Sequence, residues 1–175
     1  MKRRSEELRL ENIVGAMSLA MVDKMEQAFA AETGRGPSAV AALMQIGVEP
    51  GLSIERLRRI IALSHSASVR LVDQLVAEGL VRREASAGSD KRARAIYLTE
   101  QGESLFDTAR AARRRITEAA LSRLSGEERR ALDGIVAKMF PALVGPGDDD
   151  DVVCRLCDET VCPTERCPVP QHHRP

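Results

Sequence analysis

The stretch LSHSASVRLVDQLVAEGLVRR, which runs from Leu63 to Arg83, predicts a helix followed directly by a strand. Ser64 and Ser66 can cap this helix, because a serine hydroxyl accepts hydrogen bonds from the free amides of a first helical turn. Apolar residues then recur at the spacing of one helix face, at Val69, Val72, Leu75 and Val76. Gly79 ends the helix, and the apolar pair after it begins an extended segment.

The residues after this stretch predict a β-hairpin and two further helices. The polar segment SAGSDKRAR separates the strand from the apolar segment AIYLT, which is typical of a hairpin with a polar tip. Thr99 can cap a long helix that runs through SLFDTARAARRRITEAALSRL. Ser125 and Glu128 fit a capping box, in which each side chain accepts a hydrogen bond from the other residue's backbone amide.

The residues before this stretch predict three helices. The first covers about residues 5–32, where apolar residues recur in steps of three and four. Pro37 can open a second, short apolar helix, and a turn with a Pro-Gly pair follows it. Ser53 can cap the third helix. The buried face of that helix is expected at Leu57, Ile60 and Ile61.

This order of elements predicts a mainly α fold, a winged helix-turn-helix inside a helical frame, with a small wing sheet of two or three strands. The domain covers residues 1–147, with a DNA-binding lobe at about 38–100 and frame helices at about 5–32 and 101–144. Residues 148–175 follow as an acidic linker and a cysteine-rich tail.

The first and last helices carry apolar stripes that the small central lobe cannot cover. The stripe of the first helix contains Leu10, Val14, Met17, Met21, Met25 and Ala28. The stripe of the last helix contains Leu132, Ile135, Met139 and Leu143. A second copy of the chain would cover both, so we expect a C2 homodimer. The alternative is that the two helices pair within one chain.

Two segments resemble the multiple-antibiotic-resistance regulator (MarR) family of bacterial transcription factors. Leu63–Arg83 is similar to the family's recognition helix and its Gly-Leu-Val strand entry, and SDKRARAIYLTEQGESL, from Ser89 to Leu105, is similar to its wing. LSGEERRALDGIVAKM resembles the closing dimerisation helix, so the resemblance covers about residues 8–144. The sequence departs from the family's pattern at Arg58, where members often have alanine, and at Ala62, where glycine is usual.

The residues expected to contact DNA lie at the start of the recognition helix and on the wing. Those at the start of the helix are Ser64, His65, Ser66, Ala67 and Ser68. They are small or polar, which lets the helix approach base edges and phosphates, although the serines could instead act only as caps. Arg70, one turn further on, is within reach of a guanine edge or a phosphate.

The expected wing contacts are Asp90, Lys91, Arg92 and Arg94. Arginine fits the narrow minor groove, where the potential is most negative. The resemblance implies that basic residues of the wing enter that groove and that an aspartate orders the wing, and we assign these roles to Arg92, Arg94 and Asp90. It also implies a small-molecule effector bound between frame and lobe, which no residue here identifies.

The charge is unevenly distributed along a chain of zero net charge. Residues 52–115 contain 13 basic and 8 acidic residues, whereas the chain from residue 148 onward contains 3 arginines and 7 acidic residues. A basic centre favours an anionic partner such as double-stranded DNA, and an acidic tail does not. No apolar run approaches the ~20 residues that span a membrane, and the charged start is unlike a signal peptide, so a cytoplasmic protein is expected.

All four cysteines lie in the tail, in the pattern C-x2-C-x4-C-x4-C, at Cys154, Cys157, Cys162 and Cys167. In a cytoplasmic chain such a cluster indicates metal or redox chemistry rather than structural disulfides. Four thiolates satisfy zinc, which we prefer, and a metal would organise a segment that has little apolar surface. A [4Fe–4S] cluster is an alternative, because two of the cysteines precede proline, and metal-free redox thiols are another.

The sequence therefore predicts a homodimeric transcriptional regulator, expected to be a repressor that binds a pseudo-palindromic operator and carries a four-cysteine metal centre. No paired catalytic carboxylates, Ser-His-Asp set or phosphate-binding glycine loop is recognisable, so we do not expect an enzyme. One alternative is a redox-sensing regulator in which an iron–sulfur cluster or reactive thiols are the signal. Another is a metal-handling or thiol-redox protein that does not bind DNA.

Overall fold

The computed structural model describes residues 2–85, 94–145, 150–158, 161–162 and 167–169 of the chain. The helices in chain order are α1 (Lys2–Thr33), α2 (Pro37–Val48), α3 (Ile54–Ile60), α4 (His65–Ala77), α5 (Glu100–Leu121), α6 (Gly126–Met139), the 3-10 helix η1 (Phe140–Leu143) and α7 (Asp150–Cys154). Strands β1 (Val81–Ala85) and β2 (Arg94–Leu98) form one antiparallel sheet. The predicted mainly α fold with a small wing sheet is confirmed, and the expected tip of the wing at 86–93 lies outside the described residues.

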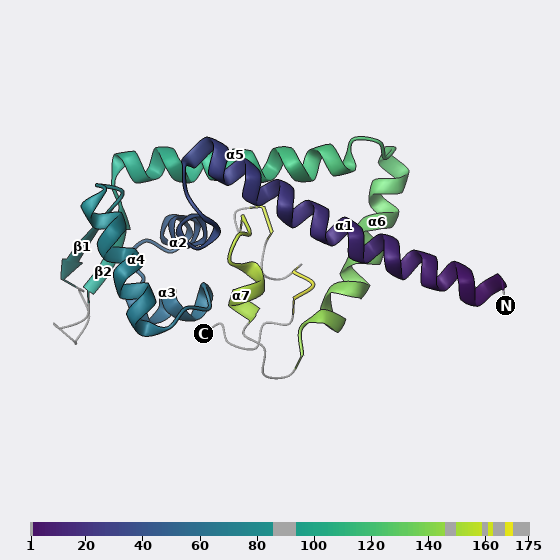
Figure 1. Ribbon diagram of the computed structural model, residues 1–175, viewed down its shortest axis with the longest axis horizontal. Coiled ribbons are helices and arrows are strands. Elements are labelled where there is room, and N and C mark those ends of the chain that lie inside the picture. The colour runs from purple at the N-terminus through teal and green to yellow at the C-terminus, as the bar shows by residue number, and fades with distance from the viewer. Residues whose placement is uncertain (1, 86–93, 146–149, 159–160, 163–166, 170–175) are drawn as a thin grey trace.

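The elements form a lobe at one end of a helical frame (Figure 1). Helix α5 runs along the top of the view, α1 packs against it at an angle, and α6 descends from the far end of α5. The lobe consists of α2, α3, α4 and the two strands. The yellow tail, which includes α7, lies between the lobe and α6. Among the described residues, no helix combines the length and apolar character needed to cross a membrane.

An aliphatic core holds the lobe together. Its members from α2, α3, α4, the sheet and the turn before the sheet include Leu43, Ile46, Leu57, Ile60, Val72, Leu75, Leu80 and Ile96, all at most 2% exposed. A second buried cluster joins the frame to the lobe through Phe29, Val40, Met44, Ala109 and Ala112. The two alanines lie on α5, and their small side chains let α1 and α2 approach the α5 backbone closely.

Four predicted helix caps are confirmed. The capping side chains are those of Ser53, Ser64, Thr99 and Ser125. Each accepts a hydrogen bond from the backbone amide three residues further on, at 3.1 to 3.3 Å. At α6 the capping box is complete, because Glu128 accepts from the Ser125 amide at 2.8 Å. This hydrogen bond lowers the pKa of Glu128 below its usual value.

The buried face of α4 is rotated from the one predicted. Val76 was expected to face inward but is 38% exposed, and Val69 is only half-buried. The fully buried residues of this helix are Ser68, Val72 and Leu75. A short amphipathic helix has a broad apolar stripe, so its exact orientation depends on packing partners that periodicity does not reveal.

Apolar side chains remain exposed on both helices that were expected to dimerise. On α1 these are Leu8, Leu10, Ile13, Met17, Leu19 and Val22, all at least 45% exposed. On α6 they are Ile135, Val136 and Met139, with Leu143 in η1. No residue of α6 is buried within the described chain. These two helices therefore do not bury their apolar stripes against each other.

The start of α5 packs so closely on the lobe that only glycine fits at position 102. A Cβ atom on Gly102 would lie 2.0 Å from the backbone oxygen of Leu80. We therefore expect Gly102→Ala to lower the free energy of unfolding by about 3 kcal/mol, because the backbone must move to relieve the overlap. Denaturant unfolding would measure the change. Gly134→Ala is the control, because a Cβ there meets nothing within 4 Å, and it should stabilise α6 by about 1 kcal/mol. Equal effects at the two positions would contradict this explanation.

Candidate nucleic-acid interface and cysteine cluster

Helices α3 and α4 form the predicted helix-turn-helix. The turn between them contains Ala62, whose φ of 54° lies in the left-handed region that favours glycine. The amide of Leu63 donates to the carbonyl of Arg58 at 3.0 Å, which closes the end of α3. Alanine is thus tolerated where the sequence departs from the glycine usual in the resembling family, at a cost of about 1 kcal/mol.

Most of the predicted recognition residues are accessible at the start of α4. Ser64, His65 and Ser66 are exposed, and Ala67 is half-buried. The hydroxyl of Ser64 also serves as the helix cap and lies 3.3 Å from the hydroxyl of Ser66. Arg70 is exposed one turn further on. These residues form the outer face of the helix-turn-helix.

Ser68 does not belong to this face, so its prediction as a DNA contact is corrected. Its side chain is 0% exposed, and its hydroxyl has no hydrogen-bond partner among the described residues. Ser68 lies four residues before Val72 and seven before Leu75, which places all three on the buried side of α4. The small polar side chain therefore fills a core position of the lobe.

The base of the wing is ordered by the strand pairing of β1 and β2. Arg94 is exposed and stands opposite Ala85 at the end of the sheet that leads to the wing tip. Near the other end, the guanidinium of Arg82 lies over the ring of Tyr97, 4.9 Å from its centroid. The predicted contacts Asp90, Lys91 and Arg92 lie outside the described residues.

Ion pairs separate the arginines of the lobe into two groups. Arg83 pairs with Asp73 at 2.6 Å, and Arg58 pairs with Glu55 at 2.5 Å, where its hydrogen bond lowers the pKa of the glutamate. The arginines for which the described residues provide no ion pair are Arg59, Arg70 and Arg94. Their charges are available to an anionic partner. Arg59 was not identified from the sequence, because its exposure depends on how α3 packs in the lobe.

The four cysteines predicted as metal ligands all line one small apolar cavity. It has a volume of about 150 Å³, and α6 and η1 contribute Val136 and Phe140 to its wall. Cys154 is buried and the other three are half-buried. Pro168 and Val169 complete the lining. The tail thus brings together four soft sulfur donors from positions up to 13 residues apart in sequence.

The chemistry of this donor set fits a thiophilic metal. Four thiolates in an apolar cavity can satisfy either a zinc ion or an iron–sulfur cluster. Among the residues that the structure describes, however, no three His, Cys, Asp or Glu side chains are already arranged as ligands of one ion. The side chains of the cysteines would therefore have to reorient to close around a metal.

The tail is anchored to both the lobe and the frame. Arg56 of α3 pairs with Asp151 of α7, and Gln45 of α2 donates to the carbonyl of Arg155 at 3.0 Å. On the frame, Arg110 of α5 pairs with Asp158.

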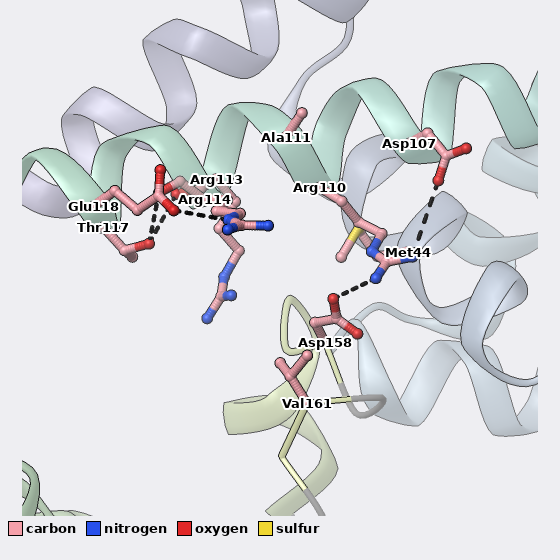
Figure 2. A pocket seen from close by; sticks show the side chains of 10 residues that line it. All are labelled: Met44, Asp107, Arg110, Ala111, Arg113, Arg114, Thr117, Glu118, Asp158 and Val161. Carbon is pink, nitrogen blue, oxygen red and sulfur yellow. Dashed lines mark hydrogen bonds and ion pairs between the residues drawn. The ribbon is translucent and has the colours of Figure 1, made fainter.

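A cavity of about 580 Å³ lies between α5 and the tail (Figure 2). Arg110 and Arg113 of α5 face Asp158 and Val161 of the tail across it, and Met44 of α2 also lines it. The tail therefore forms one wall of the space between lobe and frame.

Comparison with known proteins identifies the fold. Residues 33–93 match the MarR family. A YusO protein from Bacillus subtilis superposes with a TM-score of 0.67 at 22% identity, covering 81% of this chain and 98% of that one. A probable transcriptional regulator from Pseudomonas aeruginosa gives 0.55 at 26% identity, covering 74% and 98%.

A MepR variant from Staphylococcus aureus, solved bound to an oligodeoxyribonucleotide, is also similar. It superposes with a TM-score of 0.57 at 20% identity, covering 77% of this chain and 97% of that one. The described chain thus has the fold of MarR-family transcription regulators, a family of regulators and not of enzymes.

Proposed function

We propose that this chain, whose residues 33–93 match the MarR family, represses transcription by binding a pseudo-palindromic operator as a homodimer. The observation that carries the proposal is the exposed polar start of α4, next to arginines that have no ion pair among the described residues. Such a face can enter the major groove, and the adjacent wing can reach the minor groove. The solved MepR–oligodeoxyribonucleotide complex supports it, because that protein has the same fold.

The homodimer would form through α1 and α6. Both helices expose apolar side chains that the described chain leaves uncovered, and a second copy related by a twofold axis would bury the same patch on each partner. A dimer would also supply the two recognition helices that an operator with two half-sites requires.

The four cysteines would hold one metal centre per chain, with zinc preferred and a [4Fe–4S] cluster as the alternative. Support comes from the cavity that all four cysteines line and from the apolar wall around them. A bound zinc ion would supply binding energy that organises a tail with little core of its own. A small-molecule effector would find room in the neighbouring cavity along α5.

The role of the arginines can be tested by Arg70→Ala and Arg94→Ala. Each variant should bind operator DNA more weakly, because each loses one contact to a phosphate or groove, and each should lower the salt slope of binding by about one unit. Fluorescence anisotropy at several salt concentrations would measure both. Arg114→Ala, on α5 where the arginine pairs with Glu118, is the control and should leave affinity and slope unchanged. Wild-type behaviour of both test variants would remove these arginines from the mechanism.

The dimer can be tested by changing Ile135 and Met139 together to glutamate. Burying two unpaired carboxylates costs several kcal/mol, so the variant should be monomeric at micromolar concentration while its lobe stays folded. Sedimentation would give the mass, and circular dichroism the fold. The matched control changes Gln101 and Ser104, two exposed residues at the start of α5 and outside both dimerisation helices, to glutamate, and should remain dimeric. A wild-type chain that is monomeric yet binds its operator would disprove the dimer.

The metal centre can be tested on protein purified without oxygen. One zinc per chain, colourless protein and thiols protected from alkylation are expected, and Cys154→Ser together with Cys157→Ser should abolish the metal. Affinity should fall at acid pH, because metal binding requires deprotonated sulfur. Iron with acid-labile sulfide and a brown colour would instead identify the cluster. Four freely reactive thiols and no stoichiometric metal would refute both.

A further inference from the structure

We propose that the tail transmits the metal state of the four cysteines to the DNA-binding lobe, through the contact between α7 and α3. The tail would then regulate DNA binding as well as bind metal. The inference rests on the proposed metal centre and DNA binding, and adds that the two are coupled.

The position of the tail makes such coupling feasible. It lies between the lobe and α6, with α7 against α3 of the helix-turn-helix (Figure 1). Its cysteines line the cavity to which Val136 and Phe140, at the end of the frame, also contribute. One short segment therefore contacts both bodies whose relative orientation determines where the recognition helix lies.

The principal contact with the lobe is the ion pair of Arg56 with Asp151. Two guanidinium nitrogens reach the two carboxylate oxygens, one of them at 3.2 Å, which is a bidentate geometry. The side chain of Asp151 is 6% exposed and that of Arg56 is 23% exposed. Bulk solvent therefore screens the pair less than it screens a surface pair. Arg56 belongs to α3, so the ion pair acts directly on the helix-turn-helix.

The anchoring residues alternate with the cysteines along the chain. Asp151 lies three residues before Cys154 on the same helix, so a movement of the helix backbone at Cys154 would also move the carboxylate. Arg155, whose carbonyl accepts from the buried amide of Gln45, and Leu156 lie between Cys154 and Cys157. The side chain of Leu156 packs against both the lobe core and the cluster that joins the frame to the lobe.

The tail is held on the frame side by a second set of contacts. Asp158, directly after Cys157, pairs with Arg110 of α5. Cys154 packs in a small cluster with Val144 and Val169, next to Phe140 of η1. A metal that draws the four sulfurs together would fix these points relative to each other, because four-thiolate coordination permits little freedom in the positions of the ligands.

Operator affinity would follow from this constraint. A dimer binds two half-sites only when its recognition helices are spaced by about one helical turn, 34–36 Å. The spacing depends on the angle between lobe and frame, which the metal-ordered tail would fix through α3 and α5. Metal and operator would then be coupled ligands, and each must change the affinity for the other by the same factor.

The test compares the full-length wild type, with its metal counted as purified, with the same protein after chelation under reducing conditions. The probe is a DNA fragment selected from a random library by the metal-loaded wild type. Metal removal should change operator affinity by about tenfold, a typical coupling between two sites. Metal affinity measured with and without the DNA fragment should differ by the same factor.

Asp151→Asn isolates the coupling, because it removes the charge from the contact with Arg56 and leaves all four cysteines in place. This variant should keep its full metal content, while metal removal should change its operator affinity by less than about threefold. Asp133→Asn is the matched control. Asp133 is an exposed residue of α6 for which the described residues give no ion pair, and its variant should behave as wild type.

The outcomes separate the inference from the proposed function. If metal binds and DNA binds but affinity is unchanged by metal removal, the coupling is overturned and the proposed function stands. If Asp151→Asn keeps the full tenfold response, the route through α3 is overturned. If no metal is bound or no DNA fragment can be selected, the proposed function fails and the inference fails with it.

Discussion

The first turn of α5 lies directly against the backbone of the lobe, and the remaining architecture depends on this contact. Gly102 leaves no side chain between the helix and the carbonyl of Leu80. Thr99 donates its amide to the same carbonyl at 3.0 Å and its hydroxyl to the carbonyl of Gly79 at 2.6 Å. The end of α4, both strands and the start of α5 therefore meet at one point. The direction in which α5 leaves the lobe is set there.

From that point α5 acts as the common support of lobe and frame. Ala109 and Ala112 allow Phe29 of α1 and Met44 of α2 to pack on it, so the frame helix and the lobe contact the same side of one rigid helix. Arg110, which lies between the two alanines in sequence, forms an ion pair with Asp158 of the tail. Any change in how the tail is seated is thus exerted on the helix from which the lobe projects.

Local signals in the sequence predicted most of the fold. Ser53, Thr99 and Ser125 cap helices because capping needs only a side-chain oxygen and the backbone amides of the next turn. The orientation of α4 was predicted less well, since Ser68 is buried and Val76 is exposed. A buried serine cannot be identified from the periodicity of apolar residues, and the neighbours that bury it lie elsewhere in the chain.

The sequence alone predicted the cysteines of the candidate site, but not the contacts that hold the tail in place. Four clustered cysteines are visible in any reading of the sequence, and the structure does place them on one cavity. The ion pair of Arg56 with Asp151 joins residues 95 positions apart, and no periodicity links them. Helix α7 is too short for an amphipathic pattern and was not foreseen. The seating of the tail on the lobe was accessible only from the three-dimensional packing.

The stacking of Arg82 on Tyr97 gives the molecule a natural optical label. The chain has one tyrosine and no tryptophan, so its near-ultraviolet emission comes from a single ring at the foot of the wing. That ring also lies against Gly51, in the turn that precedes the helix-turn-helix. Rearrangements between wing and helices would therefore alter the emission of one known chromophore, without any attached dye.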